Sequence, residues 1–200
     1  MNPGDDQQGF SMLEVLVSMA VLLLAVSGIT GLLIHNGRTN RSQQIAAEVQ
    51  ANARACMTVI MQKLRTAGWD PGNAAISTLT LDPDDEDAND ADGVAEIVIY
   101  ADYDANGTTD GADEEVTIRH VGDRIEWKTS SAGAFAIVAV NITNDADDDG
   151  TVEPLFVADS ITNPTRLTVQ VTARSAELDP RTGDFRRWTL TSDVALRSAL

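Results

Sequence analysis

The densest group of residues able to hold a metal ion lies in the stretch DYDANGTTDGAD, residues 102–113. Oxygen-bearing residues recur at alternate positions, and Gly107 stands at the sixth, where a cation-binding loop turns sharply. Oxygens at this spacing surround one hard cation, because alternate residues point inward as the loop closes. The stretch therefore predicts a calcium site formed by Asp102, Asp104, Asn106, the Thr108 carbonyl, Asp110 and Asp113.

The surroundings of this loop distinguish it from an EF-hand. Its last acid is Asp113 rather than glutamate, which resembles the loops of dockerin-type domains, and no helical pattern flanks it. Strand-like runs stand on both sides instead, so we expect a calcium loop inserted between two strands. The alternative is a solvated acidic turn that binds no ion.

Two further acidic stretches match the calcium-loop pattern less completely. The twelfth position of DADDDGTVE would be Phe156, so one ligand has to come from elsewhere or from water, and a calcium site and a solvated loop stay equally open. The stretch 82–93 has Ala88 at the first position and is expected to be a loop without an ion. The second candidate site comprises Asp145, Asp147, Asp149, Thr151 and Glu153.

Strand-like runs separated by turn residues occupy the chain after position 75 and must position these loops. The turns Gly122-Asp123 and DPRTG predict two hairpins, and apolar residues alternate with polar ones over 167–171, which predicts one buried face. We therefore expect an antiparallel sheet. The expected strands are 75–81, 95–101, 115–121, 124–129, 135–143, 166–174 and 186–196.

One long helix is expected before the strands. Val15 to Ile34 are 20 consecutive residues without a charge, which form about 30 Å of helix, the hydrocarbon thickness of a bilayer. Apolar residues then resume at three- and four-residue spacing until Gly68, which is expected to end the helix. The stripe expected to face the strands comprises Ile45, Val49, Ala53, Cys56, Met57, Ile60 and Leu64.

Near the start of the chain, a Gly-Phe step is followed by an acid, Glu14, and then directly by this uncharged run. The stretch reads GFSMLEVLVSMAVLLLAV. A secretory signal peptide is disfavoured, because the run is too long, no basic residue precedes it and no small-residue cleavage site follows it. A plain membrane anchor fits the length but leaves Glu14 unexplained. A carboxylate in hydrocarbon costs about 3 kcal/mol, so it needs a partner.

These residues resemble the prepilin signal of type IV pilins and type II secretion pseudopilins. The resemblance implies that a prepilin peptidase cuts between Gly9 and Phe10, usually with N-methylation of Phe10. It implies that Glu14 pairs with the new ammonium of a neighbouring subunit and so sets the register of assembly. It further implies a single-pass protein of the bacterial inner membrane, with its head outside the cytoplasm, that enters an extracellular pilus or a periplasmic pseudopilus with other pilin subunits.

The leader departs from the family pattern. Asp5 and Asp6 stand where family leaders usually carry basic residues, and Arg38 and Arg41 follow the uncharged run on its far side. Counting positive charges therefore specifies the topology poorly.

Two other stretches resemble PilW-like minor pilins most closely, and J-type pseudopilins of type II secretion share a looser version. They are QANARACMTVIMQKLRTAGWDP, residues 50–71, and SDVALRS, residues 192–198. The resemblance implies an α+β, pilin-like fold with a long helix packed on an antiparallel β head. The implied parts are a leader at 1–9, a membrane or filament-core helix at 10–35, its continuation at 36–68, and the head at 69–200.

Charge and composition restrict the classes of function. The chain has 14 basic and 31 acidic residues, a net charge of −17, which disfavours nucleic acid and anionic membrane surfaces as partners. Its single cysteine allows no intrachain disulfide. Neither histidine adjoins a nucleophile and no phosphate-binding loop is present, so no enzymatic activity is predicted.

The sequence thus favours a minor pilin of a type IV pilus whose head is stabilised by Ca²⁺. The alternatives are a J-type pseudopilin of a type II secretion pseudopilus and a calcium-dependent adhesion module on a simple membrane anchor.

Overall fold

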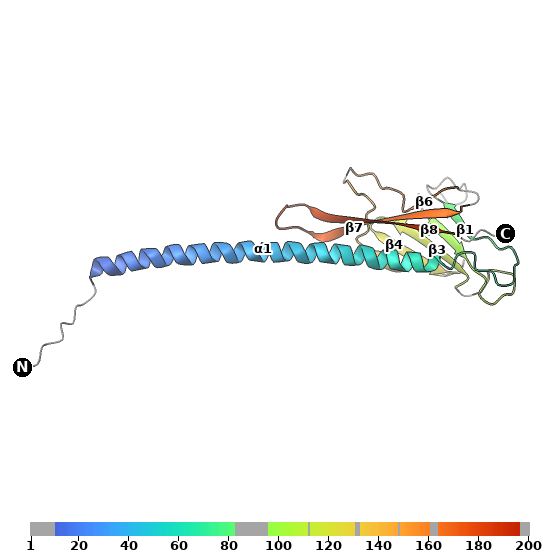
Figure 1. Cartoon of the computed structure of the whole chain (residues 1–200), viewed down its shortest axis with the longest axis horizontal. Helices are drawn as coiled ribbons and strands as arrows, with labels where there is room; N and C mark the ends of the chain where they lie inside the picture. The colour runs from blue at the N-terminus through green and yellow to red at the C-terminus, as the bar shows by residue number, and fades with distance from the viewer. Residues whose placement is uncertain are drawn as a thin grey trace, which may run out of the picture.

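A computed structural model describes residues 11–82, 96–111, 113–130, 133–147, 149–160 and 164–196. Figure 1 shows one long helix that extends far beyond a β-rich head. The predicted α+β, pilin-like plan is confirmed. The elements are α1 (Met12–Leu64), β1 (Leu79–Asp82), β2 (Glu96–Tyr100), β3 (Glu115–Val121), β4 (Arg124–Thr129), β5 (Ala136–Val140), β6 (Phe156–Ala158), β7 (Arg166–Leu178) and β8 (Phe185–Ala195).

The helix α1 is continuous over 53 residues. Its end differs from the sequence prediction, because it stops at Leu64 and the next residues form tight turns. The N–H of Gly68 donates to the carbonyl of Tyr100 in β2 rather than to a helix carbonyl (2.9 Å), and Gly68 has a φ of +69°. The hydrogen bond to the sheet thus replaces the last turn that the sequence predicts.

The two halves of α1 have different surroundings. Every residue from Met12 to Gly37 is exposed, and the helix is long and apolar enough to cross a membrane. In the second half the predicted stripe is confirmed, since all seven of its residues are buried against the head. The apolar first half of α1 therefore extends away from the head and does not pack against it (Figure 1).

The head contains two antiparallel sheets rather than one. The first has the order β1-β2-β3-β4-β5, and the second has the order β6-β7-β8. Both predicted hairpins are confirmed, because Val121 pairs with Arg124 and Leu178 pairs with Phe185. The sequence did not predict β6, which has only three residues.

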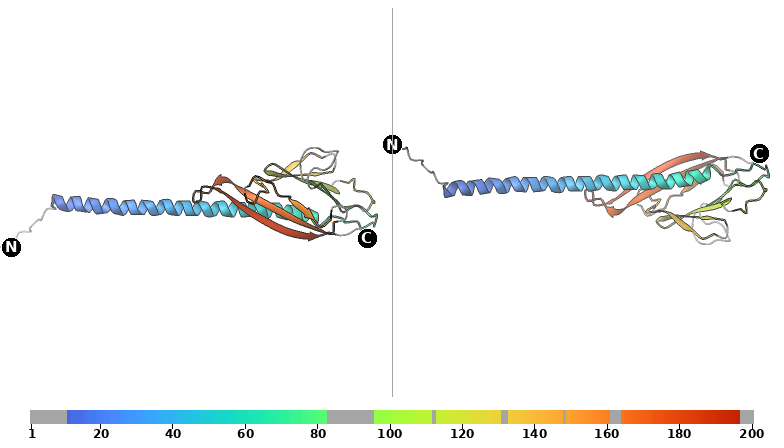
Figure 2. Two further views of the ribbon diagram at one scale, coloured as in Figure 1. Left: turned by 90° about the horizontal axis from the view of Figure 1, so that it is seen from above. Right: turned by 90° about the horizontal axis from the view of Figure 1, so that it is seen from below.

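A short segment joins the two sheets. Ile142 forms an isolated bridge with Ala173 of β7, and the N–H of Thr143 donates to the Thr172 carbonyl (3.0 Å). The buried faces of both sheets and the second half of α1 enclose one core, with α1 between the sheets (Figure 2). Its fully buried side chains include Ile60, Leu64, Ile97, Ile118, Ile125, Ile142, Leu155, Leu167, Val169 and Val171.

Cys56 belongs to this core, as predicted, and is 1% exposed. Burial raises the pKa of its thiol to about 12. The thiol therefore stays protonated at neutral pH and is a packing residue, because the thiolate is the reactive form.

A polar contact fastens the β7–β8 hairpin to α1. The carboxylate of Asp179, which is fully buried, accepts hydrogen bonds from the Ser42 hydroxyl (2.8 Å) and from Arg186 Nε (2.5 Å). Beside this contact, Arg41, the residue before Ser42, pairs with Glu177 (2.5 Å). The hairpin is thus held against α1 where the helix leaves the head.

This contact predicts a pH dependence of stability. The Arg181 backbone N–H and the side chains of Arg186 and Ser42 lower the pKa of Asp179 from 3.8 to about 2, although burial acts to raise it. A carboxyl with a lowered native pKa stabilises the fold above its unfolded pKa, and that contribution is lost as the pH falls from about 4 towards 2. Asp179→Asn is therefore expected to melt at a lower temperature than wild type at neutral pH, with the difference narrowing below pH 4.

Thermal melts of the full chain in detergent from pH 2 to pH 7 measure this difference. Asp184→Asn, on the exposed part of the same turn, is the matched control and should follow the wild-type curve. A constant gap between Asp179→Asn and wild type over the whole range would contradict the assignment.

Candidate functional site

The first site residue that the structure describes is Glu14. It lies in the first turn of α1, which begins after Ser11, and it is exposed. A carboxylate there is favoured by the partial positive charge of the helix N-terminus. Gly9, Phe10 and the leader 1–9 lie outside the described residues.

The first acidic loop connects β2 to β3, as predicted, and its base is fixed by backbone hydrogen bonds. The Asp102 N–H donates to the Trp69 carbonyl after α1 (2.7 Å), and the Ala101 N–H donates to the Glu114 carbonyl (2.8 Å). Asp102 is fully buried and Glu114 is 2% exposed. Both acids are therefore held at the junction of the helix end and the five-stranded sheet.

The loop closes by hydrogen bonds from backbone N–H groups to its own acids. Asp102 accepts from the N–H groups of Asn106 (3.2 Å) and Gly107 (2.9 Å). Gly107 has a φ of +82°, a conformation that glycine adopts without strain, as the sixth position of the calcium pattern requires. Glu114 accepts from the N–H groups of Tyr103 (2.8 Å) and Gly111 (2.6 Å).

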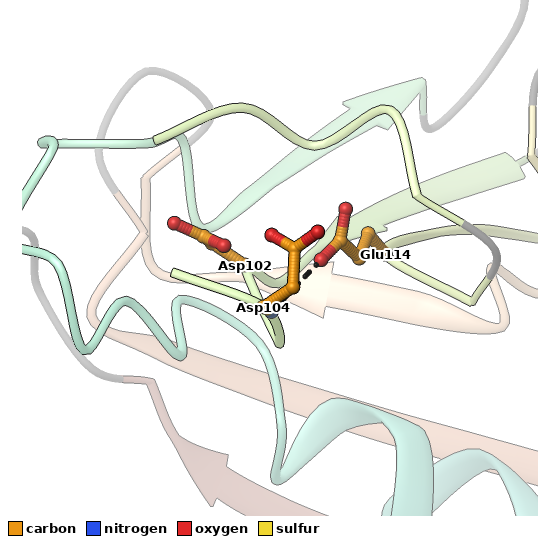
Figure 3. A group of neighbouring side chains, drawn as sticks. All are labelled: Asp102, Asp104 and Glu114. Carbon is orange, nitrogen blue, oxygen red and sulfur yellow. Dashed lines mark hydrogen bonds between the residues drawn. The ribbon is translucent and has the colours of Figure 1, made fainter. Parts of the chain in front are cut away.

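Three carboxylates converge in this loop. Asp102, Asp104 and Glu114 each offer one oxygen, and these oxygens lie within 4.8 Å of one another (Figure 3). Among the described residues none of the three forms an ion pair. Oxygen donors that lie this close together without a basic neighbour suit a hard cation such as Ca²⁺.

Sequence reasoning missed Glu114 and chose its neighbour Asp113 instead. Asp113 is exposed, has a φ of +70°, and is not part of the converging group. The signal was present in the sequence, because glutamate is the residue that closes many calcium loops and Glu114 follows the expected position directly.

The remaining predicted ligands contact one another on the outer side of the loop. The Thr108 hydroxyl lies 2.6 Å from Asn106 Oδ1 and 2.5 Å from Asp110 Oδ1, and its single proton is donated to one of these oxygens at a time. The same hydroxyl is the main cause of a lowered pKa at Asp110, which keeps that carboxylate charged. These three residues thus contact one another but lie outside the converging group.

The second acidic loop repeats the hydrogen bonds of the first. Gly150, with a φ of +85°, donates its N–H to Asp145 (3.3 Å), as Gly107 does to Asp102. The Asp149 N–H donates to Asp147 (3.3 Å), and the Thr151 N–H donates to Asp149 (2.7 Å). Equivalent bonds join Asn106 to Asp104 (3.1 Å) and Thr108 to Asn106 (2.7 Å) in the first loop.

Glu153, one of the predicted ligands, contacts the backbone of the second loop but is not part of the group that converges there. Both of its carboxylate oxygens accept from the Ala146 N–H (3.0 and 3.3 Å), the counterpart of the Tyr103–Glu114 bond. Asp145, Asp147 and Asp149 each place one oxygen within 4.8 Å of the others. Of the third acidic stretch, 82–93, residues 83–93 lie outside the described residues.

Comparison with known proteins identifies the beginning of the chain. A family model described as "Prokaryotic N-terminal methylation motif" matches residues 5–30. No curated protein and no solved structure matches the chain. The matched segment contains the expected cut site, Glu14 and most of the uncharged run, so the chain carries a prepilin-type signal and the match supports a type IV pilin or pseudopilin type of subunit.

Proposed function

We propose that the chain is a minor pilin, a structural subunit that joins a type IV pilus through its N-terminal helix. The observation that carries the proposal is the methylation motif at residues 5–30, which runs directly into a helix whose second half is packed into a β head. One rigid rod thus connects a membrane-compatible, exposed half to a folded head.

The geometry gives each half of α1 a role in assembly. The exposed apolar half stays in the bilayer until it packs against the same half of other subunits. Cleavage after Gly9 would create an ammonium at Phe10, about 6 Å along the helix axis from Glu14. Glu14 would pair with that group on a neighbouring subunit, since two opposite charges in hydrocarbon stabilise each other.

We further propose that Ca²⁺ orders the head. Asp102, Asp104 and Glu114 would hold the ion in the first loop, and the loop that starts at Asp145 would hold a second ion. The repetition of one hydrogen-bond pattern in two separate loops supports this reading. The chain lacks a disulfide, so a bound cation would supply the cross-link between the helix end and the sheet.

Intact-mass measurement after co-expression with a prepilin peptidase tests the subunit proposal. The mature chain is expected to lack residues 1–9 and to begin at Phe10, with the mass of one added methyl group. Gly9→Leu, which places a side chain next to the cut, is the matched control and should keep its leader. A wild-type chain that keeps residues 1–9, in cells that process another prepilin, would favour the anchored adhesion module instead.

A further inference from the structure

The positive charges of the chain gather at one end of the head. Residues 35–47 of α1 and residues 174–187 of the hairpin together hold six of the 14 basic residues and only three of the 31 acids. The net charge of −17 is therefore unevenly distributed: this end of the head is positive, and the rest of the chain is strongly negative. Figure 1 shows the β7–β8 turn at the end of the head that faces the exposed half of α1.

This end lies close to the expected surface of the bilayer. The hairpin contacts α1 at Arg41 and Ser42, seven and eight residues after Ile34, where the uncharged run ends. At the rise of an α-helix, this places the contact roughly 10–12 Å beyond the hydrocarbon. The headgroup layer occupies about 5–8 Å of that distance, so arginine side chains reach it from here.

The groups at this end are suited to lipid. Arg38 lies one helical turn before Ser42 on the same face of α1, and Arg181 lies in the hairpin turn; both are exposed, and among the described residues neither guanidinium has an ion-pair partner. The cross-strand pair Leu178 and Phe185 is 54% and 38% exposed. Asp184 is the one acid in the turn whose carboxylate has no partner among the described residues.

We propose that this end of the β7–β8 hairpin docks on the phospholipid headgroups of the membrane that holds α1, before the subunit enters a filament. Arg38 and Arg181 bind lipid phosphates, and the exposed side chains of Leu178 and Phe185 face the headgroup layer. The inference rests on the proposed membrane anchoring of α1.

The charge distribution favours lipid over another subunit as the partner. On a second copy of the head, the acidic groups lie in separate loops, so only one such loop at a time could contact Arg38 and Arg181. A headgroup layer, by contrast, offers phosphates over its whole surface. The acidic remainder is repelled by an anionic surface, so it points away while the positive end points inward. Each arginine near such a surface contributes about fivefold to the docking equilibrium.

Site-specific fluorescence quenching in vesicles tests the docking. The full chain would carry one added cysteine, labelled with an environment-sensitive dye, in vesicles of phosphatidylethanolamine and phosphatidylglycerol with spin-labelled headgroups. The added cysteines are Thr182→Cys in the hairpin turn, Thr151→Cys in the second acidic loop, and Leu24→Cys in the uncharged run. The native Cys56 reacts slowly, because it is buried and its thiol has a raised pKa.

The dye at position 182 is expected to be quenched strongly and the dye at position 151 weakly. Arg38→Gln and Arg181→Gln should each lower the docked-to-undocked ratio about fivefold, whereas Arg65→Gln, at the far end of α1, should leave it unchanged.

Equal, weak quenching at positions 182 and 151, with the blue-shifted emission of a dye inside the bilayer at position 24, would overturn the docking and leave membrane anchoring intact. Absence of that blue shift at position 24 would overturn both. Protection of position 182 only in assembled filaments would assign this surface to another subunit and also overturn the lipid assignment.

Discussion

Glu14→Ala is expected to leave the protein in the membrane and to remove it from filaments. Removing a charge eases insertion into hydrocarbon, so membrane fractions should contain the variant at the wild-type level. In a filament, however, the ammonium of a neighbouring Phe10 would lose its partner. An unpaired charge in hydrocarbon costs about 3 kcal/mol, which corresponds to about a hundredfold loss of incorporation.

Quantitative immunoblots of sheared filaments and of membranes measure this ratio. Glu14→Gln keeps the size of the side chain and removes its charge, so it should lose incorporation as Glu14→Ala does. Glu48→Ala, an exposed acid in the second half of α1, is the matched control and should be incorporated normally. Wild-type amounts of Glu14→Ala in sheared filaments would show that Glu14 does not set the register of assembly.

The helix and its buried stripe were predictable because their signals are local. Residues three and four apart lie on one face of any α-helix, so the spacing from Ile45 to Leu64 was enough to identify the packed face. The hairpin at Gly122 was predictable for the same reason, since its turn residues adjoin the strands that they connect.

Features that depend on distant parts of the chain could not be predicted. The Ser42–Asp179 hydrogen bond joins residues 137 positions apart, and no pattern in either segment indicates the other. The end of α1 moved from Gly68 to Leu64 because a carbonyl of β2 accepts the Gly68 N–H. The separation of β6-β7-β8 into a second sheet likewise depends on the path of residues 141–144 between the sheets.

The choice between Asp113 and Glu114 shows the limit for the candidate site. Position counting favoured Asp113, but the backbone at that residue turns to a φ of +70° and the residue is exposed. Glu114 begins the return to β3 and its longer side chain reaches back to Tyr103 and Gly111. Spacing predicted an acidic loop between two strands, and the path of the backbone decides which acid lies near Asp102 and Asp104.

Calcium is expected to raise the melting temperature of the full chain in detergent by about 5–10 °C. An ion that binds only the folded loop stabilises it by about 2.7 kcal/mol at a hundredfold excess over Kd, and 1 kcal/mol shifts a protein of this size by about 2–4 °C. Extracellular sites of this kind have Kd values of about 10⁻⁴–10⁻³ M, so a hundredfold excess requires about 10–100 mM calcium, and that concentration and a chelator are the two conditions to compare. Magnesium should act much less, because it requires a smaller octahedral shell.

Three variants separate the structural assignment from the sequence prediction. Asp104→Ala and Glu114→Gln should each remove most of the calcium-dependent shift, since both residues belong to the converging group. Asp113→Ala should retain it, because Asp113 is exposed outside that group. Loss of the calcium-dependent shift in Asp113→Ala but not in Glu114→Gln would show that Asp113, and not Glu114, closes the site. A fourth variant, Asp147→Asn, measures the share of the shift that comes from the second loop.

The difference in melting temperature between Asp104→Asn and wild type distinguishes a calcium site from a solvated acidic turn by its sign. Asp104→Asn keeps an oxygen that can accept the Asn106 N–H and removes one of three converging negative charges. If the carboxylates are there to hold a cation, their repulsion destabilises the loop without it, so the variant should melt above wild type in chelator and below it in calcium. If the turn binds no ion, calcium does not bind the folded chain in preference to the unfolded chain. Whichever of wild type and Asp104→Asn melts higher in chelator then also melts higher in calcium.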